Sequence, residues 1–247
     1  MLNFNGNDLS NDIRVTDVVR PILPPSLLTT SKIVGRPGEL LHYKQHGSYT
    51  IPVSFIIIES KNDSLRNKVR ELADKLDTDL PAPLIFSDEP DKYIDAIVSE
   101  GTDLAEIVSI GKGTINFYCP DPYWYAIEDD IIESNTSGII EFVRKGTAES
   151  FPLIEIKGTN NGSITIENED TKMTYTGKLG EGETLCLDTK YITAYIIDSS
   201  GNTRSVVDEL DNLDFPVLKK GKNFLGIISN GGTTITSIKI TCRSRWK

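Results

Sequence analysis

Two histidines, His42 and His46, are the first candidates for metal chemistry in this chain of 247 residues. On a helix, their spacing would bring both imidazoles to one face, where they could share a zinc ion. The surrounding pattern is instead typical of a strand, in which the two positions lie roughly 13 Å apart at about 3.3 Å per residue. Because the sequence holds no third histidine and no cysteine nearby, we predict surface or interface histidines and no metal site.

A cysteine nucleophile is the second candidate, because Cys119 lies close to Asp121. A Cys–His pair would have to use one of the two histidines, which lie roughly 75 residues upstream. Asp121 stands between Pro120 and Pro122, whose rings restrict the backbone and suit a fixed turn better than a proton shuttle. We therefore predict that its carboxylate accepts hydrogen bonds from backbone N–H groups or tyrosine hydroxyls.

Two further patterns only superficially suggest catalysis or nucleotide binding. Gly111-Lys112-Gly113-Thr114 has the composition of a phosphate-binding loop, but a strand pattern follows it in place of the helix whose amides would face the phosphate. Glu167 and Glu183 could be chosen as a glycosidase pair, but nothing fixes their carboxylates at the required separation of about 5 Å or 6.5–9.5 Å. We predict no enzymatic activity and no cofactor.

The elements that must position these residues mix strands with one helix in the first half of the chain. Polar–apolar alternation over residues 13–20 predicts a strand, and the prolines of residues 21–25 predict a stiff connector. Glycines between residues 35 and 47 favour a turn between paired strands, and residues 51–58 are typical of a buried strand. Further strands are expected at residues 84–86, at residues 93–98 and in one long segment from Glu106 to Tyr118.

The helix is predicted from an apolar repeat that forms one stripe about three turns long. Asn62-Asp63-Ser64 supplies an N-cap, and the prolines at positions 81 and 83 prevent continuation. The residues of the stripe are Leu65, Val69, Leu72, Ala73 and Leu76. Such a stripe must pack on a sheet.

The second half of the chain alternates short strand patterns with glycine- and asparagine-rich turns. The polar residues 128–138 are interpreted as a linker or a strand-rich hinge. Strands are expected at residues 153–157, 163–168, 173–176, 183–187, 194–197, 224–228 and 235–241. We predict a mostly β protein, with an N-terminal β-sandwich-like domain carrying one packed α-helix (residues 1–133) and a C-terminal antiparallel β-sandwich (residues 134–247).

Charge and cysteine content exclude several classes of protein. Lysine and arginine against aspartate and glutamate give 12 − 22 = −10 for residues 1–133 and 14 − 14 = 0 for residues 134–247. A nucleic-acid clamp needs clustered cations, so this distribution argues against one. Three cysteines far apart are not a disulfide framework, and with neither a leader nor a membrane-spanning run we expect a cytosolic origin.

Several passages occur together in a recognisable order. They are Phe4-Asn5-Gly6 before a short strand, Gly35-Arg36-Pro37-Gly38-Glu39 before a strand that contains Phe55, the helix at residues 62–76, the run Phe117-Tyr118-Cys119-Pro120-Asp121-Pro122-Tyr123, and residues 215–223 with the pattern Phe-Pro-x-Leu-x-x-Gly-x-Asn. In type, order and spacing, over essentially the full length, they resemble the distal tail protein (Dit) family of siphophages that infect Gram-positive bacteria.

The resemblance implies a structural virion protein without catalysis. It implies a homo-hexameric ring at the distal end of the tail tube, a baseplate hub whose neighbours are the major tail tube protein, a tail-associated tip or fibre protein and the tape measure protein. DNA would pass through its channel without specific binding, and no membrane is involved. Such a protein would be made and assembled in the cytoplasm of the bacterial host. Its C-terminal domain would resemble galectins and carbohydrate-binding modules in fold, which does not establish sugar binding.

The resemblance also assigns roles to two groups of residues. Residues 35–49 are expected to form an arm that reaches the neighbouring subunit, so that deleting them leaves a folded monomer. The interface residues of the arm would be Gly35, Arg36, Gly38, Leu40, Leu41 and Tyr43. A structural motif at the domain corner would comprise Cys119, Asp121, Pro122 and Tyr123. We interpret this motif as the rigid exit from the ring-forming domain.

Two further hypotheses concern charge and sugars. If part of the negative charge of residues 1–133 lines the channel, repulsion would keep DNA from adhering during ejection. The alternative function is a non-catalytic carbohydrate-binding protein for attachment to the host surface. That function usually requires solvent-facing aromatic rings on a sheet, and some of the few aromatic residues in the second half must fill its core.

Overall fold

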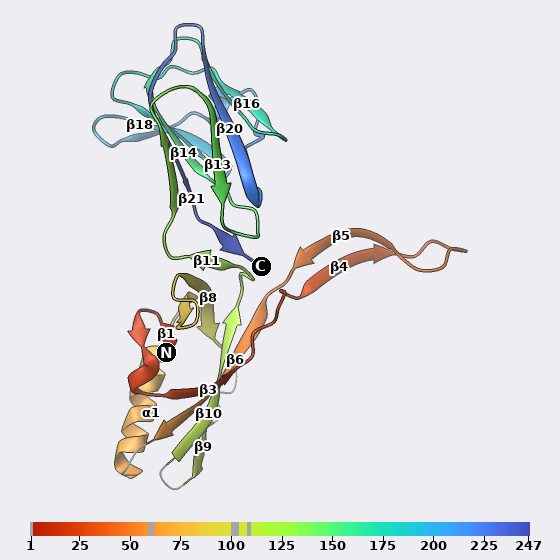
Figure 1. Cartoon of the computed structure of the whole chain (residues 1–247), viewed down its shortest axis with the longest axis vertical. Coiled ribbons are helices and arrows are strands. Elements are labelled where there is room, and N and C mark those ends of the chain that lie inside the picture. Colours follow the sequence, from red (N-terminus) through yellow and green to blue (C-terminus); the bar gives the residue numbers. More distant parts are fainter. Residues whose placement is uncertain (1, 59–61, 100–103, 108–109) are drawn as a thin grey trace. The chain divides into compact units, whose positions relative to one another are not determined.

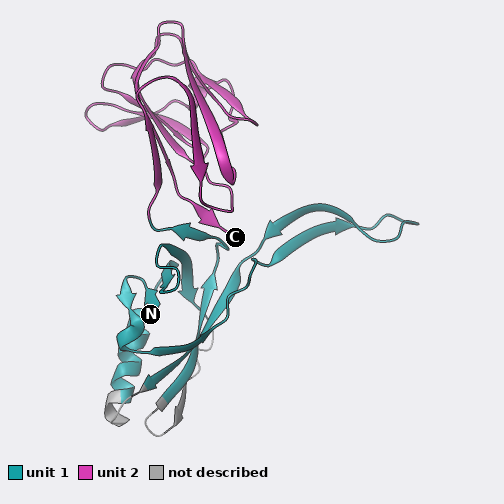
Figure 2. Ribbon diagram, viewed as in Figure 1, with its two compact units in different colours: residues 1–127, 247 teal, residues 128–246 magenta. Residues whose placement is uncertain are grey.

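The computed structural model describes residues 2–58, 62–99, 104–107 and 110–247. The chain divides into two compact units, unit 1 (residues 1–127 with 247) and unit 2 (residues 128–246), coloured separately in Figure 2. The sequence places the division slightly later, after residue 133. Among the described residues, no helix has the length and apolar character needed to cross a membrane.

Unit 1 combines an antiparallel sheet, a helix and a separate hairpin (Figure 1). Its elements are β1 (Leu2–Phe4), β2 (Asn7–Asp8), a 3₁₀ turn (Leu9–Asn11), β3 (Arg14–Val18), β4 (Ser26–Ser31), β5 (Leu40–His46), β6 (Tyr49–Ile58), α1 (Asn62–Leu76), β7 (Ala82–Phe86), β8 (Lys92–Val98), β9 (Leu104–Ile107), β10 (Ile110–Cys119) and β11 (Trp124–Ala126). The main sheet has the strand order β2-β1-β7-β8-β10-β6-β3, while β9 pairs with β10 and β11 with β8. β4 and β5 form a sheet of their own.

Helix α1 has the predicted bounds and buries most of the predicted stripe, although Ala73 is exposed. Leu65, Leu72 and Leu76 are buried in the core of unit 1, and Val69 packs against it. The same core holds side chains from the middle of the sheet, where the rings of Phe4 and Phe117 lie 5.2 Å apart between centroids. The side chains of the predicted N-cap, residues 62–64, lie outside the described residues.

The long strand predicted from Glu106 to Tyr118 is wrong, because the structure contains two antiparallel strands there. β9 and β10 pair with each other, with Ile110 opposite Ile107 and Gly113 opposite Leu104. Two strands of a tight hairpin can share one continuous pattern of β-forming residues, so composition does not mark the reversal. Residues 108–109, which connect the two strands, lie outside the described part of the chain.

Unit 2 is the predicted antiparallel β-sandwich. Its elements are β12 (Asp130–Ser134), β13 (Gly138–Arg144), β14 (Leu153–Thr159), β15 (Ser163–Glu167), β16 (Lys172–Tyr175), β17 (Thr184–Asp188), β18 (Thr193–Ile197), β19 (Thr203–Ser205), a 3₁₀ turn (Val207–Glu209), β20 (Gly221–Asn230), β21 (Thr234–Cys242) and β22 (Arg245–Trp246). One sheet has the order β12-β21-β14-β17-β18-β19 and the other β13-β20-β15-β16. Buried isoleucines of both sheets, such as Ile154 and Ile227, share one core. The mostly β fold class is confirmed.

The segment interpreted as a linker belongs to this sandwich. β12 is a strand of one sheet and β13 of the other, and the Asp129 carboxylate accepts a 2.6 Å hydrogen bond from Arg243 Nε. The acidic residues 128–133 therefore count with unit 2. Each unit then has a net charge of 13 − 18 = −5. The negative charge is therefore divided equally between the two compact units and is not concentrated in the first.

Candidate functional site: an exposed hairpin and its root

An isolated hairpin, β4–β5, carries the residues predicted to form the arm. It extends from the body of unit 1 and appears in orange in Figure 1. The Gly47 N–H donates a 2.8 Å hydrogen bond to the Pro25 carbonyl, which closes the hairpin at its root. The predicted bounds of the arm, residues 35–49, are wrong at both ends. They omit β4, a short exposed strand without buried periodicity, and they include Tyr49, which begins β6 and packs on the core.

Large apolar side chains lie on both faces of the hairpin. Leu27 and Tyr43 lie on one face, because Leu27 opposes Gln45 and Thr29 opposes Tyr43, and side chains alternate along a strand. Leu28 and Leu41 lie on the other. A register shift between Thr29 and Thr30 leaves His42 as the extra residue of a β-bulge. The apolar side chains more than 50% exposed on the hairpin are Leu27, Leu28, Val34, Leu41 and Tyr43.

So many exposed apolar side chains are unusual on a hairpin that pairs with no other strand. A two-stranded hairpin is marginally stable in water because it has no sheet face to bury. Burying apolar surface yields about 25 cal/mol per Å², and the hairpin obtains little of this within its own chain. An extended apolar surface of this kind is typical of an interface with another protein.

The tip of the hairpin holds the glycines predicted to form a turn. Gly35 and Gly38 have φ angles of 80° and 83°, a left-handed conformation that favours glycine, and the prediction of a turn between paired strands is confirmed. Arg36 lies between them, and its N–H donates a 3.1 Å hydrogen bond to the Ile33 carbonyl. All six predicted interface residues thus lie in this one element, three in the tip and three on β5. Their role in an interface stays a prediction.

The second predicted group, Cys119 to Tyr123, lies at the root of the same hairpin. The Asp121 carboxylate accepts hydrogen bonds from the Tyr123 N–H (3.1 Å) and from the Tyr125 hydroxyl (2.6 Å). The prediction made for this carboxylate is confirmed. The ring of Tyr123 meets the ring of His46, the last residue of β5, edge to face at 6.0 Å between centroids.

Strand pairing and a side-chain hydrogen bond also connect the end of β10 with the root of the hairpin. β10 pairs with β6 along its length, and at the end of the pairing Cys119 lies opposite Tyr49. The Tyr118 hydroxyl donates a 2.9 Å hydrogen bond to Ser48 Oγ in the short connection between β5 and β6. The sequence did not predict that the corner motif contacts the root of the hairpin. The aromatic residues at the adjoining ends of β6 and β10 were the only signal in the sequence.

The chemistry of the site is not that of a nucleophile or a metal ligand set. Cys119 is fully buried, and burial raises the pKa of its thiol to about 12, so the thiolate that would attack a substrate is not formed at neutral pH. His42 Nε2 lies 2.8 Å from Ser31 Oγ, within hydrogen-bond distance. Among the described residues, no group of three or more His, Cys, Asp or Glu side chains is placed to hold a metal ion.

The other patterns considered for catalysis are structural. Gly111-Lys112-Gly113-Thr114 lies within β10 and pairs with β6, so no loop or helix N-terminus faces a phosphate there. Glu167 lies 3.7 Å from the Lys172 ammonium group. Glu183 accepts a 2.7 Å hydrogen bond from the Gly180 N–H in a turn before β17. Each of the two carboxylates thus has a local partner of its own.

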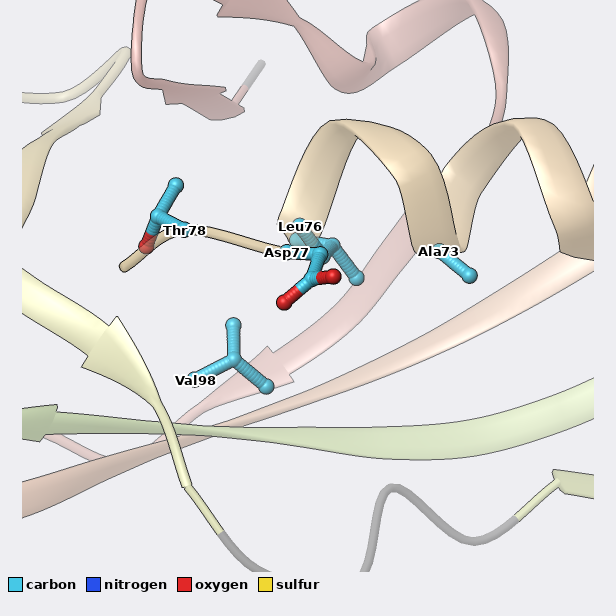
Figure 3. Close-up of a pocket in the computed structure, with 5 residues that line it drawn as sticks. All are labelled: Ala73, Leu76, Asp77, Thr78 and Val98. Carbon is cyan, nitrogen blue, oxygen red and sulfur yellow. The ribbon is translucent and has the colours of Figure 1, made fainter. Parts of the chain in front are cut away.

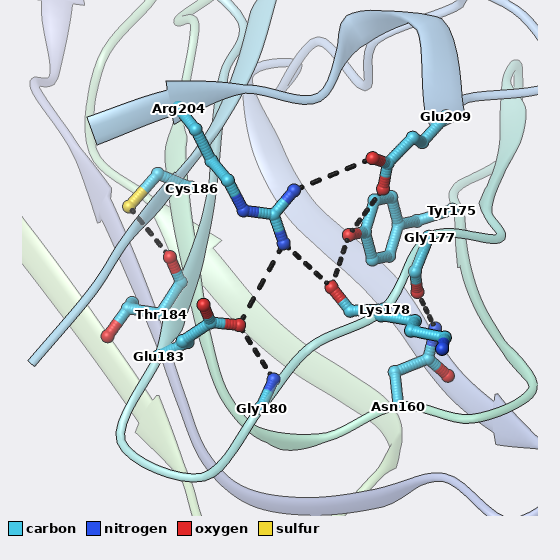
Figure 4. A network of polar contacts seen from close by, with 10 residues as sticks. All are labelled: Asn160, Tyr175, Gly177, Lys178, Gly180, Glu183, Thr184, Cys186, Arg204 and Glu209. Carbon is cyan, nitrogen blue, oxygen red and sulfur yellow. Dashed lines mark hydrogen bonds and ion pairs between the residues drawn. The ribbon is translucent and has the colours of Figure 1, made fainter. Parts of the chain in front are cut away.

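Unit 2 contains a cleft of about 390 Å³. Its lining consists of Lys157, Gly158, Thr159, Glu181, Gly182, Glu183, Thr234 and Thr236, a set without an aromatic ring on which a sugar could stack. Beside it, Arg204 donates a 3.0 Å hydrogen bond to the Lys178 carbonyl, and the Tyr175 hydroxyl donates to Glu209 (Figure 4). Tyr175 is fully buried, so its ring belongs to the core and not to a binding surface.

Comparison with known sequences and structures gives independent information. Residues 11–119 match the family described as phage tail protein RIFT-related domain. No curated protein sequence matches the chain.

Two solved structures are similar over most of the chain. The SPP1 Dit (gp 19.1) protein, described as a paradigm of the hub adsorption apparatus in phages that infect Gram-positive bacteria, is 17% identical with a TM-score of 0.80. That match covers 100% of this chain and 98% of the SPP1 chain. A chain of the phage P2 baseplate in its activated conformation with calcium is 10% identical with a TM-score of 0.47, covering 95% of this chain and 91% of its own.

Proposed function

We propose that the chain is the hub of a siphophage tail, because residues 11–119 match the family described as phage tail protein RIFT-related domain. The match of this domain and the full-length fold shared with SPP1 Dit support the resemblance to the distal tail protein family. In this proposal the chain is a structural phage tail protein located in the virion tail. In our proposal it forms a hexameric ring at the distal end of the tail tube.

The observation that carries the ring proposal is the β4–β5 hairpin, whose two faces both expose apolar side chains. A hairpin that finds no cover in its own chain can find it in the next copy. Because the covering surface differs from the hairpin itself, such a contact is head to tail, and it closes into a ring when its rotation closes. The corner motif at residues 119–123 contacts the root of the hairpin through the rings of Tyr123 and His46.

The partners follow from the position of such a ring. The tail tube protein would contact one side and the tip or fibre protein the other, with the tape measure protein and then DNA passing through the channel. Assembly would take place in the host cytoplasm. Unit 1 carries a net charge of −5, and we propose that part of it faces the channel and repels DNA. A neutral or basic lumen in a determined ring would refute this part.

The structure sharpens the deletion that tests the ring. Residues 26–46 should be removed and Pro25 joined to Gly47 through two glycines, because a hydrogen bond already links these residues at the root. We expect the full chain to form a six-fold ring in light scattering and negative-stain images, and the variant to remain a monomer. Thermal unfolding should show that the variant keeps its cores. A variant that still forms rings would overturn the role of the hairpin.

The cleft of unit 2 is the place where the alternative function, carbohydrate binding, can be tested. Its threonine hydroxyls and carboxylates can hydrogen-bond a sugar, although its lining offers no aromatic platform. Glycan-array binding by the full chain separates the two functions, because a pure hub protein should bind none. Binding that is abolished by Thr234→Val with Thr236→Val would establish the alternative at this cleft.

A further inference from the structure

The hairpin is opposite in charge to the body that carries it. Residues 26–46 contain Lys32, Arg36 and Lys44 against Glu39, which gives 3 − 1 = +2. The rest of unit 1 has 10 − 17 = −7. A basic arm on an acidic body is self-complementary between copies, because the arm of one copy is attracted to the body of another.

Arg36 is the most prominent of these cations. It lies at the tip between Gly35 and Gly38, beside the fully exposed Val34. No hydrogen bond or ion pair joins its guanidinium to any described residue, whereas Lys32 lies 3.7 Å from Glu39. The tip thus presents an unpaired guanidinium and an apolar side chain together.

A matching acidic surface lies at the C-terminal end of α1. The exposed residues Asp74, Asp77 and Asp79 fall within one short stretch, and no partner is recorded for their carboxylates among the described residues. Lys75 does not neutralise them, because its ammonium group binds Asp12 at 2.7 Å. Carboxylates at the negative end of a helix dipole are unfavourable in the isolated chain. A cation from outside would remove this cost.

The same surface is hollowed. A cavity of about 230 Å³ is lined by Ala73, Leu76, Asp77, Thr78 and Val98. Figure 3 shows the Asp77 carboxylate directed into the space between α1 and Val98. The hydroxyl oxygen of Thr78 is buried without a hydrogen-bond partner in the described structure, and a buried polar atom of this kind is costly to leave unpaired.

We propose that this hollow receives the Arg36 side chain from the hairpin of a second copy. The guanidinium would pair with the Asp77 carboxylate, and its aliphatic stem would lie against Leu76 and Val98. The inference rests on the proposed ring and names the surface that takes the arm. It commits to a second copy because the charges of arm and body are complementary.

Charge reversal in two separate variants tests the contact. Arg36→Glu and Asp77→Lys should each raise the protein concentration needed for half-assembly by about tenfold, because each places like charges at every interface. An equimolar mixture of the two variants should assemble near the wild-type concentration, since a ring in which they alternate contains only attractive pairs. Sedimentation velocity measures all three samples.

Matched controls are available in unit 2. Lys222→Glu and Glu141→Lys make the same charge changes at exposed positions of the four-stranded sheet, and they should leave assembly unchanged. Raising the salt from about 50 to 500 mM should weaken wild-type assembly and reduce the difference between variants. Unfolding curves should confirm that each variant is folded.

The outcomes separate this inference from the proposed function. If deletion of residues 26–46 dissolves the ring but neither reversal weakens it, the ring stands and the hollow is not its contact. If both reversals weaken assembly and the mixture does not recover, the arm binds another acidic surface and the inference fails. If the full chain stays monomeric, the proposed function fails first.

Discussion

Arg144 is a buried charge whose terminal nitrogens donate to carbonyl and hydroxyl oxygens, while its Nε has no hydrogen-bond partner among the described residues. Its side chain is in the core of unit 2 at 3% exposure and donates hydrogen bonds to the Ala148 carbonyl at 3.1 Å and the Leu218 carbonyl at 2.8 Å. It also donates to Ser150 Oγ. Burial lowers the pKa of the guanidinium, but not enough to discharge it. One cation thereby joins the end of β13 to two loops.

Arg144→Met should destabilise unit 2 by about 2–4 kcal/mol, because the carbonyls would lose a charged donor and stay buried. Urea unfolding at neutral pH measures the change. The neighbouring Lys145→Met is the matched control, since Lys145 is exposed and its loss should cost less than about 0.5 kcal/mol. Equal effects of the two substitutions would contradict the role given to the buried guanidinium.

His46 at the root of the hairpin predicts a dependence on pH. Burial and the positive charge of nearby lysines lower its pKa below the ordinary 6.5, and no hydrogen-bond partner is recorded for Nδ1 among the described residues. The unfolded chain therefore binds the proton more readily. The contribution of His46 is complete above its ordinary pKa and is lost as the pH falls through the lower folded value.

His46→Gln should accordingly reduce the loss of stability between pH 7.5 and pH 5. The effect should be below about 1 kcal/mol, because the ring is only partly buried. Thermal unfolding of unit 1 at both pH values measures it. His42→Gln, at an exposed position of the same strand, is the matched substitution for comparison.

At the scale of elements, the β4–β5 hairpin and helix α1 differ in how much of their apolar surface is buried. Most of the helix stripe is buried in its own unit, whereas most of the apolar side chains of β4–β5 stay exposed. Buried periodicity made α1 and β6 predictable to within about two residues at each end. β4 was missed because an exposed strand has no buried face to impose an alternating pattern. β12 lies in the polar segment interpreted as a linker or strand-rich hinge, and Ile132 alone marks its inner face.

Substitution of apolar residues on the hairpin should therefore weaken assembly without destabilising the monomer. Leu28→Ser with Leu41→Ser removes the apolar side chains of one face. We expect a loss of rings in light scattering, and a change in unfolding free energy below about 0.5 kcal/mol, because both side chains are more than half exposed.

A serine at an apolar position outside the hairpin is the matched control for this double variant. Ile131 on β12 is 57% exposed, like Leu28, and Ile131→Ser should leave the rings intact. Rings that persist in the hairpin double variant would contradict an apolar arm interface.

At the scale of the whole molecule, the chain has two separate hydrophobic cores. One consists of residues up to Cys119, and the other spans Ile132 to Ile240. A core that is complete within one stretch of sequence can fold by itself. We expect residues 128–247 to fold as an independent sandwich with a single cooperative transition, measured by calorimetry on the isolated fragment. A fragment that is unfolded at room temperature would contradict this expectation.

The sequence by itself determined what depends on local pattern and composition: the mostly β class, the helix, the turn at Gly35 and Gly38, the fixed carboxylate of Asp121 and the resemblance to phage distal tail proteins. Only the tertiary structure decided that the hairpin begins at Ser26, that Tyr123 contacts its root, and that the acidic residues 128–133 belong to the second unit. These features depend on which distant strands pair and which surfaces stay uncovered. Short polar strands carry no local signal of their partners, so chain pairing and burial had to be seen in three dimensions.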